Sequence, residues 1–515
     1  MIKPNHTSVH RQDAGMAAGL FLLTLLSRIP FRSQILYHWD SVNFAYAMRE
    51  FSVAQEQPHP PGYIVYVWLC RLVDLLFGDA QTTMVWISVF ASALAVVAFF
   101  YLGRSIFDRS TGLTAALFLA TSPLFWFYGE IALPHTLDTL LVIVSVWWLY
   151  ETMRGDRRYL YPAIAVLAVA GGARPQTLVF LVPLLLFALR RVGWTRFLTA
   201  GALGVVLCLI WFVPLTVSSG GLANYLRVMG EFGRRFQNTT SILMGAGWEG
   251  IKYNARKLAM YTLYGWNLAL APGLVYAAGR LWRREWPLRG EKSIFLLLWV
   301  APALAFYAVI HMGQQGLIFI FLPVLLLFSA VGLTRLLTDR SRWLAAATAS
   351  LVVLNAGIFL LAPEYPLGEG TQRLLTRATL ANSDHYYEDR FDAILNNFSP
   401  QSTAILAADW HHVEYYLPDY KLLPVDIVSG DEPGAEWLHH RQGEERVSAQ
   451  NLGLTPDAGG KVRIVIFDDK LTPFNDTPDL AQTVELAHGS QMKAFVLSMN
   501  QSLYIEQTFG IVDRE

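Results

Sequence analysis

The sequence predicts a polytopic α-helical membrane protein with about eleven transmembrane helices, followed by a C-terminal α/β domain outside the membrane. Of its 515 residues, 54% are hydrophobic and only 16% are charged, whereas globular chains contain about 25% charged residues. The apolar residues are also unevenly distributed. Long apolar stretches fill the chain up to residue 362, and charges become frequent only from Pro363 onward.

The overall composition excludes several other classes of protein. The 40 basic and 40 acidic residues cancel, so the chain lacks the basic surplus typical of nucleic-acid binders. Its hydrophobicity is too high for intrinsic disorder. Two cysteines, Cys70 and Cys208, are too few for a disulfide framework or a structural zinc site. We therefore expect no nucleic-acid partner and a fold built on apolar helices.

Eleven apolar stretches are candidates for crossing the bilayer, whose core of about 30 Å requires about 20 helical residues. The shorter ones need close packing against other helices or a thinned bilayer. The stretches lie at roughly 14–30, 83–102, 111–127, 136–150, 160–172, 176–190, 196–217, 258–279, 293–310, 316–336 and 343–362.

The distribution of arginine predicts the orientation of these stretches, because short cytoplasmic loops are rich in Lys and Arg. If the N-terminus is cytoplasmic, every inner loop is basic. The short outer turns near 128–135, 172–175 and 311–315 then contain a single Lys or Arg residue, Arg174. Arg28 and Pro30 directly follow the apolar run of the first stretch, so we expect a retained anchor rather than a cleaved signal peptide. The predicted location is the plasma (inner) membrane, with an extracytoplasmic C-terminus. The inner-loop cations are Arg104, Arg109, Arg154, Arg157, Arg158, Arg190, Arg191, Arg196, Arg280, Arg283, Arg284, Arg289, Lys292, Arg335, Arg340 and Arg342.

The expected domains are a transmembrane domain over 1–362 and a soluble extracytoplasmic domain over 363–515. In the soluble domain, helix is expected at Gly370–Phe398 and His411–Leu417. Short apolar, β-rich stretches predict strands. They are Ala404–Ala407, Leu422–Ile427, Val462–Phe467, Ala494–Ser498 and Leu503–Ile505.

A histidine pair in this domain, in the string Asp409-Trp410-His411-His412, suggests a metal site. However, adjacent side chains point to different sides of a helix or strand. A surface or packing role is therefore the favoured interpretation.

The first outer segment, 31–82, contains the main catalytic candidate. Asp40 follows the first span by about ten residues, in His38-Trp39-Asp40-Ser41. A carboxylate at the outer interface can accept a proton from an acceptor hydroxyl, which is general-base catalysis. Spacing alone favours the simpler interpretation, a helix N-cap before the helix-compatible run Val42–Phe51.

The same segment contains a rigid turn, Gln57-Pro58-His59-Pro60-Pro61-Gly62-Tyr63. Its prolines and glycine bar a regular helix. His59 could donate a hydrogen bond to a phosphate or a sugar, or could simply be part of the turn. The following stretch, Tyr63–Phe77, fits an amphipathic helix lying in the membrane interface.

The other outer turns and loops supply acidic and basic candidates for binding a substrate. Intramembrane acids are costly and usually face a cavity or a partner, although a position in the first turn of a helix also suits Asp138. Arg174 could snorkel to the headgroups or hold a lipid phosphate. The basic and aromatic segment 218–257 suits a phosphate and a sugar ring, or a plain interfacial loop. The candidates are Glu130, His135, Asp138, Arg174, Arg234 and Arg235.

Taken in order, these motifs resemble the GT-C superfamily of membrane glycosyltransferases. The nearest group is that of the dolichyl-phosphate-mannose–protein mannosyltransferases (family 39-like) and their bacterial relatives. The string His59-Pro60-Pro61-Gly62-Tyr63 is similar to that group's His-Pro-Pro-x-Tyr signature. Pro123–Glu130 resembles the end of its third span, and Gln315–Pro323 resembles its late helix, with Leu or Ile where an aromatic residue is common. The resemblance covers about residues 15–360.

The resemblance implies transfer of a sugar, with inversion, from a polyprenyl-phosphate donor to a hydroxyl of a glycan, lipid or protein acceptor at the outer face of the membrane. It makes Asp40 the general base or an acceptor-orienting ligand, and this outweighs the N-cap interpretation. Glu130 or Asp138 would be a second acidic site, and Arg174, Arg234 and Arg235 would hold the leaving phosphate. A divalent metal (Mg or Mn) is left open. The alternatives are a transporter or flippase of lipid-linked sugars, a cell-surface polysaccharide polymerase or ligase, and a non-catalytic scaffold.

Overall fold

The computed structural model describes residues 6–284, 290–366, 373–429, 436–441, 446–448, 450–498 and 500–513. The chain divides into two compact units. The first, here called the helical unit, comprises Met1–Gln34 and Asn43–Leu380. The second, here called the sheet unit, comprises Ala381–Glu515 together with the short segment Ile35–Val42. The sequence predicts a boundary at Pro363 instead, and it does not predict that residues 35–42 group with the C-terminal part.

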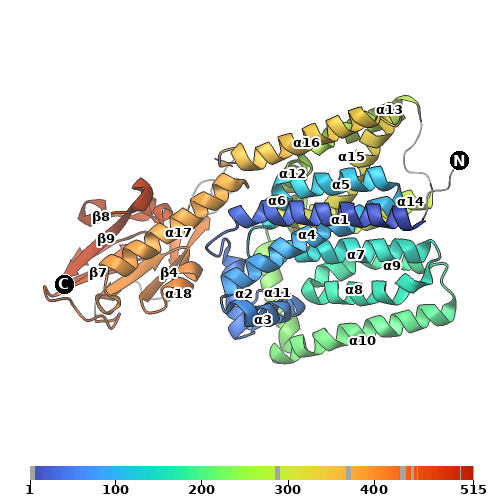
Figure 1. Ribbon diagram of the computed structural model, residues 1–515. Coiled ribbons are helices and arrows are strands. Elements are labelled where there is room, and N and C mark those ends of the chain that lie inside the picture. Colours follow the sequence, from blue (N-terminus) through green and yellow to red (C-terminus); the bar gives the residue numbers. More distant parts are fainter. Residues whose placement is uncertain are drawn as a thin grey trace. The chain divides into compact units, whose positions relative to one another are not determined.

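All eleven apolar ranges predicted from the sequence are helical (Figure 1). Three of them are not single helices. Ser122 separates α5 from α6, a 3-10 turn at Asn267–Ala269 separates α12 from α13, and a 3-10 turn at Gln315–Ile320 precedes α15. Pro123 and Pro323 explain two of these breaks, because proline lacks the N–H that a continuing helix would use. The helices are α1 (His6–Arg28), α4 (Ala80–Ile106), α5 (Arg109–Thr121), α6 (Pro123–Tyr128), α7 (His135–Met153), α8 (Leu160–Ala173), α9 (Pro175–Leu189), α10 (Trp194–Ser218), α12 (Gly247–Trp266), α13 (Leu270–Trp282), α14 (Glu291–Val309), α15 (Leu322–Leu336) and α16 (Ser341–Leu361).

Among the described residues, five helical segments are long and apolar enough to cross a bilayer. The chain is therefore a multi-pass membrane protein, as the sequence predicts, and a count of eleven crossings stays a prediction. Of the five, the one in α4 is by far the most buried inside the protein, and α4 packs against α1, α5 and α7 (Figure 1). The five segments are Arg11–Phe31, Ala80–Ile106, Trp194–Ser218, Glu291–Val309 and Ser341–Leu361.

The two longer predicted outer segments fold into short helices. The first contains α2 (Trp39–Arg49) and α3 (Ile64–Phe77), and the second contains α11 (Leu222–Gln237) and the start of α12. Leu72, Leu75 and Leu76 on α3 are more than half exposed, as expected for a helix whose apolar side lies in the interface. A short hairpin of β1 (Tyr365–Pro366) and β2 (Arg373–Leu374) follows α16.

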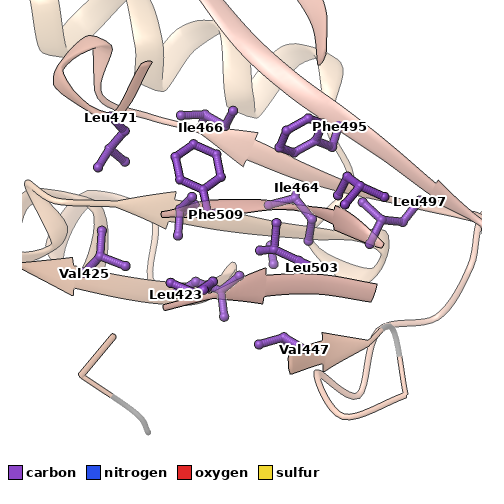
Figure 2. Packing of buried hydrophobic residues seen from close by; sticks show 14 of the residues in the cluster. Leu423, Val425, Val447, Ile464, Ile466, Leu471, Phe495, Leu497, Leu503 and Phe509 are labelled. Atoms are coloured by element: carbon purple, nitrogen blue, oxygen red, sulfur yellow. The ribbon is translucent and has the colours of Figure 1, made fainter. Parts of the chain in front are cut away.

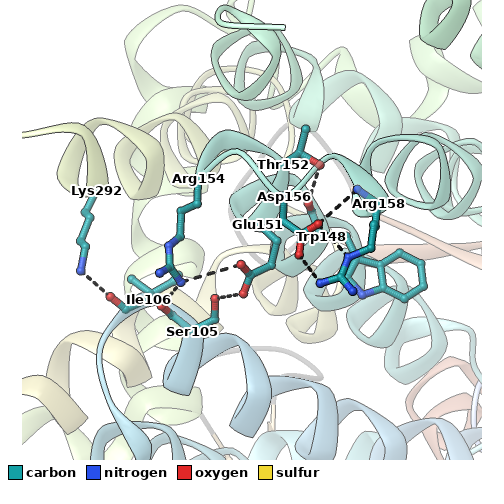
Figure 3. Close-up of polar contacts among 9 residues, drawn as sticks. All are labelled: Ser105, Ile106, Trp148, Glu151, Thr152, Arg154, Asp156, Arg158 and Lys292. Carbon is teal, nitrogen blue, oxygen red and sulfur yellow. Dashed lines mark hydrogen bonds and ion pairs between the residues drawn. The ribbon is translucent and has the colours of Figure 1, made fainter. Parts of the chain in front are cut away.

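Three of the predicted inner loops meet at one end of the helical unit (Figure 3). Lys292 Nζ, at the start of α14, donates to the carbonyl of Ile106 at the end of α4 (2.6 Å). Ser105 Oγ donates to Glu151 at the end of α7, and Arg158 pairs with Asp156 (2.8 Å) in the loop that follows. The structure thus brings these basic loops to a common end, and the prediction that this end is cytoplasmic stays a prediction.

The sheet unit is an α/β domain, as predicted. Its main sheet has the strand order β5-β4-β3-β7-β9-β8, in which β3 runs parallel to β4 and β7 and the other pairs are antiparallel. A second sheet has the order β11-β10-β6. All five predicted strands are present. The elements are α17 (Arg377–Asn397), α18 (Trp410–Tyr416), β3 (Thr403–Ala407), β4 (Lys421–Ser429), β5 (Glu436–His440), β6 (Arg446–Ser448), β7 (Lys461–Ile466), β8 (Ala481–Glu485), β9 (Gln491–Ser498), β10 (Gln501–Ile505) and β11 (Phe509–Asp513).

Side chains alternate between the two faces of the main sheet and build two cores. Leu406 and Ile464 point to one face, where they share a core with Leu503 and Phe509 of the second sheet. Figure 2 shows Ile464, Leu503 and Phe509 in this core. Ile405 points to the other face, where helices α17 and α18 supply the partners. The helix predicted at Gly370–Phe398 begins at Arg377, and its predicted start at 370–372 lies outside the described residues.

Candidate active site

A buried ion pair, Arg174 with Asp138, is the centre of the candidate site in the helical unit. Arg174 Nη1 donates to Asp138 Oδ2 (3.3 Å), and Thr177 Oγ1 donates to the other carboxylate oxygen (2.6 Å). The two charged residues are 7% and 3% exposed. The hydroxyls of Tyr63 and Tyr307 lie close enough to interact electrostatically with the guanidinium. The sequence suggests both charged residues but not their pairing.

The backbone around Arg174 explains how the guanidinium is presented. Arg174 is the extended residue (φ −155°, ψ 101°) between the end of α8 and the start of α9. Pro175 favours this conformation, because the residue before a proline avoids the α region. Asp138 lies in the first turn of α7. The pair is thus formed between two helix N-termini, where N–H groups and helix dipoles favour anions.

Arg174 retains hydrogen-bonding capacity despite its pairing. Its Nε is buried and has no hydrogen-bond partner among the described residues. A buried donor without a partner is costly, so an anion that accepts from Nε would remove that cost. A phosphate oxygen has the required charge and geometry.

The proline turn predicted around His59 lies next to this pair. The ring centroids of His59 and Tyr63 are 4.9 Å apart, and Tyr63 is the residue that also interacts with Arg174. On its other side, His59 stacks on Phe232 of α11 (6.1 Å). Tyr225 OH, also on α11, donates to the carbonyl of Pro61 (3.1 Å). Parts of both outer segments therefore converge near Arg174.

The two arginines predicted on α11 differ from Arg174 in environment. Arg235 pairs with Glu56 (2.6 Å) and lies over the Phe232 ring (5.3 Å). Both Arg234 and Arg235 are exposed. Arg235 therefore belongs to the rim of the region around His59, whereas Arg174 is buried.

Glu130 and His135, the remaining outer-turn candidates, have other surroundings. Glu130 is fully buried and accepts from Trp126 Nε1 (2.8 Å). The opposite charge of Arg28 acts on Glu130, and Arg28 lies over the Trp126 ring (4.4 Å). These contacts tie α1 to α6 and fit a packing role. His135 lies against the Tyr128 ring (4.7 Å). The structure thus pairs Asp138, and not Glu130, with the candidate phosphate ligand.

Asp40 belongs to the sheet unit, in the segment Ile35–Val42. It lies in the first turn of α2, which begins one residue earlier at Trp39, so it is inside the helix and is not its N-cap. Its backbone N–H donates to His38 Nδ1 (3.0 Å), and its carboxylate is 3.4 Å from the same nitrogen. Its side chain is 7% exposed.

The second histidine motif, at 409–412, does not bring its two imidazoles together on one ligand. His411 faces the ring of Trp39 (5.5 Å), whereas His412 Nε2 bonds to the carbonyl of Leu36 (2.7 Å). Both are therefore used in packing within the sheet unit. Among the described ranges, no group of three or more His, Cys, Asp or Glu side chains could hold a metal ion.

An apolar cavity lies between α8, α9 and α10 and is absent from the sequence predictions. Its volume is about 430 Å³. Its lining includes Leu178, one turn after Arg174 on α9, and Trp211, whose ring lies close to Gly172. Val205 and Leu209 line it and are 60% and 49% exposed, so it opens to the outer, lipid-facing side of these helices. The other lining residues are Ile164, Leu167, Ala168, Leu185, Ala200, Gly201, Gly204, Cys208 and Phe212.

Comparison with known proteins identifies the class. A family model described as dolichyl-phosphate-mannose-protein mannosyltransferase matches residues 58–217. This range includes the His59 turn and the Arg174–Asp138 pair, but not Asp40 or α11. No curated protein sequence matches the chain.

Solved structures are similar to this chain, and those of ArnT show its fold. ArnT from Cupriavidus metallidurans bound to undecaprenyl phosphate aligns with a TM-score of 0.51 and 13% identity, over 96% of this chain and 98% of that chain. The apo state of the same protein aligns with a TM-score of 0.51 and 14% identity, over 95% of this chain and 98% of that chain. The Archaeoglobus fulgidus oligosaccharyltransferase in complex with Zn and sulfate aligns with a TM-score of 0.45 and 14% identity, over 79% of this chain and 62% of that chain.

The fold of this chain is that of the GT-C superfamily of membrane glycosyltransferases. The resemblance predicted from the His-Pro-Pro turn and the outer acidic residues is confirmed at this level, and so is the glycosyltransferase class. Within that class, residues 58–217 are similar to the dolichyl-phosphate-mannose-protein mannosyltransferases.

Proposed function

We propose that this protein transfers a sugar from a polyprenyl-phosphate donor to an acceptor hydroxyl at the outer face of the membrane, with inversion. One observation carries the proposal: a buried arginine with an unpartnered Nε lies one helical turn before Leu178, a lining residue of an apolar cavity between α8, α9 and α10. A polyprenyl-phosphate sugar has the complementary chemistry, an anionic phosphate joined to a long apolar chain. The undecaprenyl phosphate bound to ArnT supports this choice of donor.

The donor is bound by residues of the helical unit. Arg174, oriented by Asp138, holds the phosphate through Nε, and the prenyl chain lies against the apolar wall made by Leu178 and Trp211. His59 binds the phosphate or the sugar beside Tyr63. Arg234 and Arg235 attract the anionic donor from the rim. Glu130 and His135 support the outer turn that precedes Asp138.

Asp40 is the proposed general base. The acceptor oxygen attacks the anomeric carbon while the bond from that carbon to the phosphate oxygen breaks. The hydroxyl proton passes to Asp40, and polyprenyl phosphate leaves. The leaving group gains negative charge as the bond breaks, and a fixed cation stabilises it most at that moment. Arg174 therefore lowers the barrier as well as binding the donor.

The proposed topology follows from the charges. The loops of Figure 3 are rich in arginine and would be cytoplasmic. Arg174 and Asp138 lie at the opposite helix termini of α7, α8 and α9. They and the sheet unit would then be extracytoplasmic, in the plasma (inner) membrane.

A reconstituted transfer assay with donors of long and short prenyl chain tests the proposal. Asp40→Asn is expected to abolish transfer, because the amide cannot accept the proton. The protein should still insert and keep its thermal stability. Transfer at the wild-type rate would remove Asp40 as the base.

A second variant tests the lipid part of the proposal in the same assay. Gly201 lines the cavity, and a Cβ there meets nothing within 4 Å. Gly201→Phe should therefore fill the cavity without straining α10. We expect the apparent KM for the long-chain donor to rise about tenfold, which corresponds to roughly 1.4 kcal/mol, with little change for a short-chain donor. Gly357→Phe on α16, where a Cβ also meets nothing, is the matched control. Equal effects of the two variants would argue against the cavity as the prenyl site.

A further inference from the structure

The segment that contains Asp40 is held by side chains of the sheet unit. Ile35 N–H donates to Asp384 Oδ1 on α17 (3.2 Å), and Leu36 N–H donates to Tyr416 OH on α18 (3.0 Å). His412 Nε2, also on α18, bonds to the Leu36 carbonyl (2.7 Å). Three backbone groups of two consecutive residues are thus bound by three side chains that lie about 350 to 380 positions later in the chain.

Apolar contacts strengthen the same attachment. Ile35 is 8% exposed and belongs to the core that Phe391 and Phe467 form with the main sheet. At the other end of the segment, the Trp39 ring faces His411 (5.5 Å). The attachment therefore extends up to the residue that precedes Asp40, and it combines hydrogen bonds with burial. A segment fixed in both ways has few alternative conformations.

His412 is the most constrained of the three binding side chains. It is 3% exposed, and its ring stacks on Tyr387 at 4.3 Å. Because a carbonyl oxygen can only accept, Nε2 must carry the proton, which selects one neutral tautomer. A donor that is buried, stacked and restricted to one tautomer holds its acceptor in one place.

We propose that the C-terminal sheet unit positions the catalytic base, and that His412, with Tyr416 and Asp384, is a positioning residue acting through the backbone of Ile35 and Leu36 on Asp40. This inference rests on the proposed function of Asp40. Catalytic groups lose activity steeply when they are displaced, because a misplacement of about 1 Å can cost on the order of 100-fold in rate. The sheet unit thereby has a role in the transfer reaction itself.

The test compares single variants of the full-length protein in reconstituted membranes. His412→Ala removes the donor, and His412→Gln replaces it with an amide that can still donate. His439→Ala, at an exposed histidine on β5 of the same unit, is the matched control. The measurements are kcat, the KM for the lipid donor, and hydrogen exchange of a peptide covering 35–42.

We expect His412→Ala to lower kcat 10- to 100-fold while the donor KM changes less than twofold, since the proposed phosphate ligands are elsewhere. Exchange in 35–42 should accelerate, while exchange in β3 and β7 stays unchanged. His412→Gln should recover a large part of kcat, and His439→Ala should match the wild type. A His412→Ala enzyme with faster exchange in 35–42 and wild-type kcat would overturn the inference.

Accelerated exchange in β3 would show that His412→Ala disturbs the whole sheet unit. In that case a milder variant tests the inference. Tyr416→Phe keeps the ring and removes only the hydroxyl that accepts from Leu36. It should lower kcat severalfold and expose the Leu36 amide to exchange. If the amide becomes exposed and kcat is unchanged, the inference is overturned. Asp40→Asn, measured alongside, separates the two proposals. If Asp40→Asn is active, Asp40 is not the base. If Asp40→Asn is inactive while His412→Ala and Tyr416→Phe are fully active, only the positioning role is rejected.

Discussion

Two arginine–aspartate pairs in the helical unit have opposite surroundings. Arg158 and Asp156 lie 2.8 Å apart in a predicted inner loop, with side chains that are 85% and 31% exposed (Figure 3). Arg174 and Asp138 lie 3.3 Å apart at the other ends of the helices, with side chains that are 8% and 4% exposed. The shorter pair is the more solvated one. Burial therefore distinguishes the pair that we propose to be functional, whereas the distance within the pair does not.

The physical reason is the cost of removing charge from water. An exposed pair gains little, because water and salt screen its attraction and two long side chains lose freedom. A buried pair pays a large desolvation cost and persists only where the geometry compensates or where a function requires the charge. The Arg158 pair lies in a loop whose arginines predict a cytoplasmic location, and the Arg174 pair marks the proposed site.

The largest expected difference between the pairs is in stability. Asp138→Ala leaves Arg174 as an uncompensated buried charge, a change that typically costs roughly 3–5 kcal/mol. Asp156→Ala leaves Arg158 in water and should change the melting temperature very little. Thermal unfolding of the two detergent-purified variants measures the contrast.

A double variant separates the charge from its packing. Replacing both partners, as Asp138→Ala with Arg174→Leu, removes the uncompensated charge and should recover part of the lost stability. Equal melting temperatures for Asp138→Ala and Asp156→Ala would mean that the Arg174–Asp138 pair contributes no more to the stability of the protein than the exposed pair does.

The next largest difference is expected in donor binding. Arg174→Ala removes a charge-assisted contact to the phosphate, a kind of hydrogen bond whose loss costs about 1.5–3 kcal/mol. The apparent KM for the lipid donor should therefore rise by roughly 10- to 100-fold. Arg158→Ala is the control and should leave that KM unchanged. If Arg174→Ala binds the donor as the wild type does, Arg174 is not a phosphate ligand.

The sequence is sufficient for those features that depend on local composition. Apolar length finds all eleven helical ranges, because a helix that faces lipid must be apolar along its whole length. Short β-rich runs find β3, β4, β7, β9 and β10. The strands β1, β2, β5, β6, β8 and β11 are missed. Polar residues such as Glu436 and Gln482 interrupt the apolar pattern of β5 and β8.

Features that depend on contacts between distant residues are not available from local patterns. Asp138 and Arg174 both stand out as charges near the membrane, but their pairing depends on the packing of α7 against α9. Tyr307, which interacts with Arg174, lies in an ordinary apolar helix and gives no sequence signal. The attachment of Ile35 and Leu36 gives no sequence signal either. These two residues are bound through their backbone N–H and C=O groups, which do not depend on the type of side chain.

The smallest expected effect extends the comparison of buried and exposed groups to two histidines of the sheet unit. Burial, together with the charges of His38 and Lys470, lowers the pKa of His412 to about 4, against the opposing influence of Asp409 and of the bond to Leu36. His439 is exposed. The unfolded chain binds a proton on His412 with a pKa of about 6.5. The folded state binds that proton more weakly, so this group's contribution to stability is complete above about pH 6.5 and is lost as the pH falls towards 4.

Between about pH 7 and about pH 5.5, this linkage should cost the sheet unit about 1 kcal/mol. The measurement is hydrogen exchange of the β3 amides, corrected for the pH dependence of intrinsic exchange. His411 contributes with the same sign, because burial, His412 and Arg441 lower its pKa to about 4, so the informative quantity is the difference between variants. His412→Gln should flatten the acid loss of stability relative to the wild type, whereas His439→Gln should leave it unchanged. Parallel pH curves for His412→Gln and the wild type would mean that His412 is protonated as readily in the folded unit as in the unfolded chain. Its bond to Leu36 would then not be restricted to the neutral tautomer.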